Sequence, residues 1–145
     1  MLSEREKLRV AQTCAHFNLK RRVRSVTQRF DAVLAQEGLH ITQFTLLVTS
    51  SLMDATPVSE LADALALDRT TLTRNLKPLE QKGWLKTMVA EGDARVRLVE
   101  ITPAGEALLA RSYPLWRQVQ EEVTRSFEGN YMNFLEQLEQ LDTQP

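Results

Sequence analysis

The sequence predicts a mainly α-helical fold with one small β-hairpin. Apolar residues recur at three- and four-residue spacing along most of the chain, which is the pattern of helices with one buried face. Only residues 84–89 and 96–101 form short runs typical of strands, and a polar turn containing Gly92 lies between them. With 145 residues, 43% of them hydrophobic, the chain can bury a core of ordinary size.

We expect six helices, of which the first is unusually long. It runs from about Glu4 to Gln36 with no intervening Gly or Pro. Val10, Cys14 and Phe17 begin its apolar stripe. A helix of this length cannot bury its whole apolar face against one small lobe, so part of it is expected to face another subunit.

Three shorter helices follow in the central part of the chain. Thr42 is expected to cap the second helix, which ends near Met53, and Pro57 marks a break. Ser59 is expected to cap the third helix. Asp68 is a favourable cap for the fourth, because its carboxylate can accept orphan backbone N–H groups.

The fourth helix carries an apolar stripe of three leucines, Leu72, Leu76 and Leu79. Gly83 is expected to end it in the left-handed conformation. Pro78 lies inside this helix and removes one backbone hydrogen bond, so the C-terminal half is expected to bend.

Two helices are expected after the hairpin. Thr102 and Pro103 signal the start of the fifth, because proline is tolerated at the first helical position. This helix is expected to reach about Arg125, and Pro114 predicts a kink or break within it. The sixth helix is expected over residues 130–141.

A short helix, a tight turn, a second helix and a hairpin form the outline of a winged helix-turn-helix. The net charge is −1, yet residues 69–97 contain seven Lys or Arg residues and only three acidic ones. No acid occurs from Arg69 through Leu79, where short hydroxylated side chains allow close approach to base edges and cations can reach phosphates. The residues expected to bind double-stranded DNA are Arg69, Thr70, Thr71, Thr73, Arg74, Lys77, Asp93, Arg95 and Arg97.

The tip of the hairpin combines acids and arginines around Gly92. An arginine at such a tip can enter the minor groove, whose negative potential attracts it. Two nearby acids would weaken that binding unless one pairs with an arginine. We therefore expect Asp93 to hold Arg95 in place.

The stretch from Val58 to Thr102 resembles the multiple-antibiotic-resistance regulator (MarR) family. The matching residues are Leu72-Thr73-Arg74, Leu76, Leu79, Lys82-Gly83-Trp84, Asp93, Arg95, Val99, Ile101 and Thr102. The flanking helices also fit the family layout, so the resemblance covers nearly the whole chain.

The resemblance implies a homodimer whose N- and C-terminal helices interlock. Residues 1–40 and 103–145 would form the dimerisation region, and residues 41–102 the winged helix-turn-helix lobe that binds DNA. It implies a regulator, usually a repressor, that binds a palindromic operator. A cytoplasmic location is expected separately, because the charged N-terminus lacks the apolar core of a signal peptide. Two lobes related by a two-fold axis would contact half-sites about one helical turn apart.

Members of the family often release DNA when a small aromatic, frequently phenolic, effector binds between the dimer region and the winged lobes. Candidates for lining such a pocket are His16, Phe17, Tyr113 and Trp116. The alternative is that these four residues belong to the core or to the dimer interface.

Cys14 supports a second hypothesis, because some relatives sense organic peroxides through a cysteine early in the first helix. Those relatives place a tyrosine one turn later, where this chain has Asn18, and no tyrosine precedes Tyr113. Cys14 also lies on the apolar stripe, where an inert buried cysteine is expected.

Two other classes of function are alternatives to DNA binding. The chain has two histidines and one cysteine, without a Gly-rich phosphate loop, an HExxH motif or a metal-ligand spacing, so neither an enzyme nor a metal or cofactor site is expected. A winged-helix protein-interaction module is the other alternative. Acidic residues on the exposed face of the fourth helix would favour it, and none occurs from Arg69 through Leu79. No apolar run reaches the length of about 18 residues that spans a bilayer.

Overall fold

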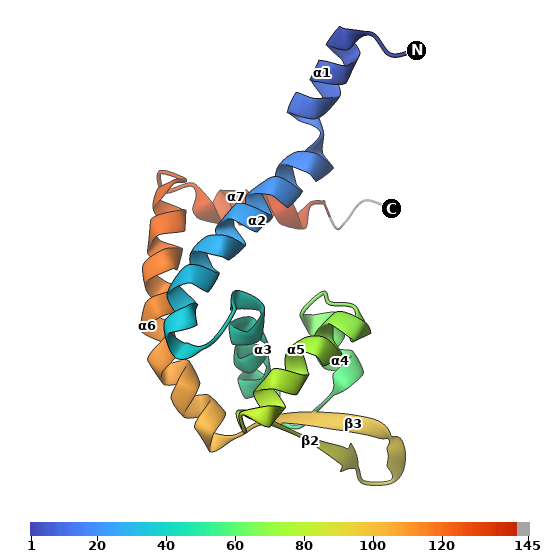
Figure 1. The fold of residues 1–145 in the computed structure, drawn as a ribbon, viewed down its shortest axis with the longest axis vertical. Coiled ribbons are helices and arrows are strands. Elements are labelled where there is room, and N and C mark those ends of the chain that lie inside the picture. The colour runs from blue at the N-terminus through green and yellow to red at the C-terminus, as the bar shows by residue number, and fades with distance from the viewer. Residues whose placement is uncertain (142–145) are drawn as a thin grey trace.

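The computed structural model describes residues 1–141 and contains seven α-helices, one short 3-10 helix, η1 (Ala35–Glu37), and one small antiparallel sheet in that range (Figure 1). The helices are α1 (Glu4–Thr13), α2 (Ala15–Leu34), α3 (Ile41–Leu52), α4 (Val58–Ala64), α5 (Arg69–Gln81), α6 (Pro103–Arg125) and α7 (Tyr131–Glu139). The strands are β1 (Thr56–Pro57), β2 (Leu85–Ala90) and β3 (Asp93–Ile101). The mainly helical fold class is confirmed, and the expected dimerisation segment 103–145 ends with four residues that lie outside the described range.

The expectation of one long N-terminal helix is wrong, because the chain breaks at Cys14. The backbone of Cys14 is extended, with φ −61° and ψ 115°, and separates α1 from α2. The side-chain amide of Asn18 donates to the carbonyl oxygens of Gln12 (3.1 Å) and Cys14 (3.0 Å), which stabilises the break. Side-chain bonds of this kind compete with regular helix. This break raises the number of α-helices in residues 1–141 from the expected six to seven.

Two expected helix caps are also wrong. The third helix of the structure, α3, begins at Ile41, with His40 and not Thr42 as its N-cap residue. The side-chain oxygen of Gln43 accepts the His40 N–H at 3.1 Å, and a carboxylate oxygen of Asp31 on α2 accepts the Ile41 N–H at 2.7 Å. Helix α4 begins at Val58 after Pro57, without a side-chain cap from Ser59.

The caps around α5 and α6 are as expected. The Asp68 side chain accepts the backbone N–H of Thr71 at 2.8 Å. Gly83 takes the left-handed conformation, with φ +71°, at the end of α5. Thr102 caps α6 by accepting the N–H of Gly105 at 3.1 Å, with Pro103 at the first helical position.

The two internal prolines do not end their helices. Helix α5 continues past Pro78 to Gln81, and α6 continues past Pro114 to Arg125. A break at Pro114 is therefore excluded, although the ribbon of α6 curves along its length (Figure 1).

The strands form a sheet in the order β1-β3-β2, so the expected hairpin gains a third strand. Thr56 pairs with Val99 and Pro57 with Leu98. Proline is tolerated there because β1 is an edge strand. On the other side β2 pairs with β3 from Leu85 opposite Ile101 to Ala90 opposite Asp93, with an irregularity beside Ala90. Strand β3 starts at Asp93, three residues earlier than expected, so the hairpin turn is tight around Gly92.

The core lies where α2, α3, α5, α6 and the base of the sheet meet. Its fully buried side chains are Leu34, Leu39, Leu46, Leu47, Leu61, Leu72, Leu79, Leu85, Leu108, Val99 and Val119. All three leucines of the α5 stripe belong to this core, with Leu76 the most exposed of them at 4%. The orientation of α5 is therefore fixed by burial.

A second set of apolar side chains remains uncovered in the single chain. The exposed large hydrophobic residues on α1, α2 and α7 are Leu8, Val10, Phe17, Leu19, Val23 and Met132. Figure 1 shows α1 extending away from the rest of the chain. The expected stripe of Val10, Cys14 and Phe17 thus faces outward in the chain by itself, and Cys14 is half-buried and not part of the core.

No helix within residues 1–141 combines the length and the apolar character needed to cross a membrane.

The close packing of α6 on the base of the sheet gives a test of the fold. A Cβ added at buried Gly105 would lie 2.2 Å from the carbonyl oxygen of Trp84 and 2.7 Å from a side-chain carbon of Ile101. Helix propensity alone predicts that Gly105→Ala stabilises the protein by about 1 kcal/mol. Because a backbone oxygen occupies the space, we expect Gly105→Ala to destabilise it by about 1–3 kcal/mol in urea unfolding.

Ala107→Ser, at an exposed position of the same helix, is the control and should change the free energy of unfolding by about 0.5 kcal/mol or less. A Gly105→Ala protein as stable as the parent would show that α6 does not approach the corner at Trp84 this closely.

Candidate nucleic-acid interface

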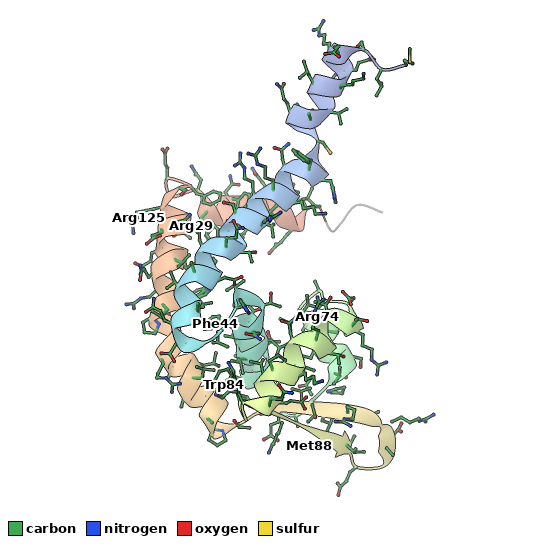
Figure 2. All side chains as sticks on the ribbon, in the orientation of Figure 1. Arg29, Phe44, Arg74, Trp84, Met88 and Arg125 are labelled. Atoms are coloured by element: carbon green, nitrogen blue, oxygen red, sulfur yellow. The ribbon has the colours of Figure 1, made fainter. Side chains whose placement is uncertain are left out.

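Burial of the leucine stripe directs the opposite face of α5 to solvent. Exposed on that face are Arg69, Thr70, Thr73, Arg74 and Lys77. In Figure 2, Arg74 lies on the side of the chain away from α6. Among the described residues, no carboxylate lies within 4.0 Å of the cationic groups of Arg69, Arg74 and Lys77. Their charges therefore remain available for an external anion.

Two threonines of α5 are engaged within the helix. The Thr71 hydroxyl donates to Asp68 at 2.6 Å, and the Thr73 hydroxyl donates to the carbonyl of Arg69 at 2.8 Å. The hydrogen bond from the Thr71 hydroxyl, followed by that from its backbone N–H, holds the pKa of Asp68 below its usual range. Thr71 is half-buried and its first role is to secure the start of α5, while Thr70 and Thr73 present their side chains outward.

The wing tip, residues 91–95, contains the expected pair of Asp93 and Arg95. One carboxylate oxygen of Asp93 accepts both the backbone N–H of Arg95 (3.0 Å) and its side-chain Nε (3.2 Å). These two bonds, the backbone one first, hold the pKa of Asp93 below its usual range. The Arg95 side chain is nevertheless 91% exposed, so Asp93 orients the arginine without covering it.

A groove of about 530 Å³ runs between α5 and the wing. Its lining residues are Pro57, Val58, Ser59, Arg69, Thr73, Leu76, Lys77, Glu80, Thr87, Arg95, Val96 and Arg97. The structure therefore brings cations from α5 and from β3 to one concave surface, although about 20 residues separate them in sequence. A second hollow of about 470 Å³ along α5 is lined by Arg69, Thr70, Thr73, Arg74 and Lys77.

Of the groove residues that sequence reasoning missed, Glu80 and Thr87 are the two that form a hydrogen bond between elements. Glu80 lies on the last turn of α5, and Thr87 lies on β2. The Thr87 hydroxyl donates to Glu80 and accepts from Arg97. No sequence motif predicts this contact, because it depends on how α5 packs against β2.

The four candidate effector residues do not meet within one chain. Trp116 stacks on Phe44 with ring centroids 6.1 Å apart and on Tyr113 at 5.8 Å. The ion pairs Arg29–Glu122 and Arg111–Glu37 place α2 antiparallel to α6, with Trp116 near the end of α2. His16 and Phe17 are at the other end of α2, about 25 Å away along the helix at 1.5 Å per residue.

A shallow hollow of about 360 Å³ adjoins the aromatic stack. It is lined by Phe44, Val48, Glu106, Leu109, Ala110 and Tyr113. Cys14 lies far from this hollow along the chain, between α1 and α2, and has no disulfide partner. Among residues 1–141 no three His, Cys, Asp or Glu side chains gather in a way that could hold a metal ion.

Comparison with known proteins identifies relatives across most of the chain. The MarR family pattern matches residues 39–96, which include α3, α4, α5, β2 and the first residues of β3. The HTH-type transcriptional regulator PecS of Dickeya dadantii is 34% identical over 59% of this chain, and the chain spans about half (54%) of the length of PecS.

Two further relatives match over nearly their full length. The multiple antibiotic resistance protein MarR of Escherichia coli is 32% identical over 83% of this chain and 87% of MarR. The crystal structure of the Mycobacterium tuberculosis regulator MosR superposes with a TM-score of 0.81 at 35% identity, over 91% of this chain and 95% of MosR. A structure of MosR in complex with DNA gives a TM-score of 0.73 at 36% identity, over 90% of this chain and 99% of that one. The chain belongs to the MarR family of transcriptional regulators.

Proposed function

We propose that this chain acts in the cytoplasm as a homodimeric repressor that binds a palindromic operator in double-stranded DNA and is released by a small-molecule effector. The observation that carries the proposal is the groove between α5 and the wing, whose cations come from both elements. A helix with exposed threonines and arginines can enter the major groove while the wing follows the adjacent backbone.

Charge supports this assignment of the surface. Arg69, Arg74 and Lys77 have no carboxylate partner within 4.0 Å in residues 1–141. An overall net charge of −1 gives no general attraction to DNA, so binding must be local to this face. The relative MosR, which is similar over 90% of this chain, has been solved in complex with DNA.

The proposed dimer accounts for the apolar side chains left uncovered on α1, α2 and α7. Phe17 and Val23 on α2 and Met132 on α7 are each more than half exposed in the single chain. We infer that a second chain covers these side chains, since a large exposed apolar surface marks an interaction site. We assign residues 1–40 and 103–145 to dimerisation and residues 41–102 to the DNA-binding lobe.

The hollow beside Tyr113 is our proposed place for the effector. Its lining is mostly apolar, and the stacked rings of Phe44, Tyr113 and Trp116 offer a surface for an aromatic ligand. His16 and Phe17 would reach this hollow only from a second chain.

Selection of bound duplexes from a random-sequence pool tests the proposed function directly. The proposal predicts enrichment of an inverted repeat whose half-sites are centred about 10 base pairs apart, or a multiple of that spacing. Recovery of no common sequence, at low salt and with a protein shown to be folded, would reject sequence-specific DNA binding.

Replacing the wing arginine gives a test of phosphate or groove contact. Arg95→Ala is expected to weaken binding on all duplexes and to reduce the slope of log K against log salt by about one unit per subunit, because one fewer cation displaces counterions. Arg111→Ala is the matched control, since Arg111 is on α6 and pairs with Glu37. An Arg95→Ala protein with the parent's salt slope would show that the wing tip does not touch DNA.

Replacing Arg74 distinguishes base contact from backbone contact. If Arg74 makes a bidentate contact with a guanine, Arg74→Ala should cost about 1–3 kcal/mol on the selected operator and much less on random duplex. Binding constants on both duplexes provide the measurement. Equal losses on the two would assign Arg74 to a phosphate.

A further inference from the structure

The two arginines of β3 are held in different ways. Arg95 forms an ion pair with Asp93 at 3.2 Å. The Nη2 of Arg97 donates instead to the uncharged hydroxyl of Thr87, at 3.1 Å. Within residues 1–141 no carboxylate oxygen lies within 4.0 Å of the Arg97 guanidinium. Arg97 is therefore oriented while its positive charge remains unneutralised.

Glu80 determines how the Thr87 hydroxyl can act. That hydroxyl donates its only proton to Oε1 of Glu80, so its lone pairs are left to accept from Arg97. Glu80 and Thr87 are half-buried, whereas Arg97 is exposed. The carboxylate thus fixes the direction of the hydroxyl and, through it, the position of the guanidinium.

This series of hydrogen bonds joins α5 to the wing. Glu80 is on the last turn of α5, Thr87 is on β2, and Arg97 is on β3 diagonally across from Thr87. All three line the groove between α5 and the wing, and Glu80 is the only acid among its lining residues. A carboxylate in this groove repels phosphate, so its presence suggests a structural role that compensates for the repulsion.

The geometry points to Glu80 and Thr87 as positioning residues that hold Arg97 in the groove, with a free charge, against one phosphate of the DNA backbone. The guanidinium has five N–H donors and uses one on Thr87, so the others remain for a bidentate phosphate contact. This inference rests on the proposed function and adds which residues prepare one of its contacts.

Replacing Glu80 distinguishes its role in positioning Arg97 from the effect of its negative charge on DNA binding. Charge alone predicts that Glu80→Ala tightens binding, because a negative group leaves the groove. The positioning role predicts the opposite, a loss of DNA affinity of about threefold to tenfold, because the Thr87 hydroxyl, and through it Arg97, is no longer oriented by Glu80. Glu80→Gln keeps the acceptor oxygen and should bind at least as well as the parent. Tighter binding by Glu80→Ala overturns the inference.

Thr87→Val is the second variant, because it keeps the side-chain shape and removes both hydrogen bonds. We expect about tenfold weaker binding to a random-sequence duplex of about 30 base pairs, and a salt slope lower by about one unit per subunit. Arg97→Ala should give the same two changes, and the double variant should lose little more than either single one. Losses that add independently would overturn the inference.

Thr49→Val is the matched control, since the Thr49 hydroxyl donates to a carbonyl within α3 and does not line the groove. Thermal unfolding of each variant separates loss of fold from loss of binding. If Thr87→Val binds normally and Arg97→Ala binds weakly, the positioning role of Thr87 is rejected, whereas the proposed function is not. Absence of DNA binding by the parent protein rejects the proposed function itself.

Discussion

Burial of the leucine stripe on α5 is the constraint on which the rest of the interface depends. Leu72, Leu76 and Leu79 are at most 4% exposed, and full burial of each such side chain stabilises the fold by about 1.5–3 kcal/mol. With these residues inside, the helix has only one rotation available. The face that carries Arg69, Arg74 and Lys77 must then point to solvent. The proposed binding surface is a consequence of the packing of the core.

The corner after α5 transfers this orientation to the wing and to α6. Gly83 turns the chain in the left-handed conformation, and the Thr102 hydroxyl donates to its carbonyl at 2.6 Å. Lys82 lies over the Trp84 ring, 4.5 Å from its centroid, and its Nζ donates to the carbonyl of Gly38 at 3.3 Å. Helix α5, the sheet and the segment between α2 and α3 are thus joined at one place.

Local signals in the sequence were sufficient where a residue acts on its own neighbours. Asp68, Gly83 and Thr102 each end or begin a helix through contacts within a few residues or through their own backbone preference. The prediction was wrong where the partner lies elsewhere. Asp31 caps α3 across ten residues, and β1 is too short to show a strand pattern. The break at Cys14 was missed because no Gly or Pro lies there to indicate it.

For the site, the exposed face of α5 and the pair of Asp93 and Arg95 were predictable from the sequence, whereas the contact of Glu80 with Thr87 depends on packing between elements.

The central claim is that the outward face of α5 contacts duplex DNA, and a photoreactive amino acid in place of Thr73 tests it most directly. Thr73 is exposed in the middle of that face, and Gln118, exposed on α6, is the comparison position. We predict that irradiation cross-links the protein to its selected duplex from position 73 and not from position 118. Cross-linking from position 118 with none from position 73 would contradict the account.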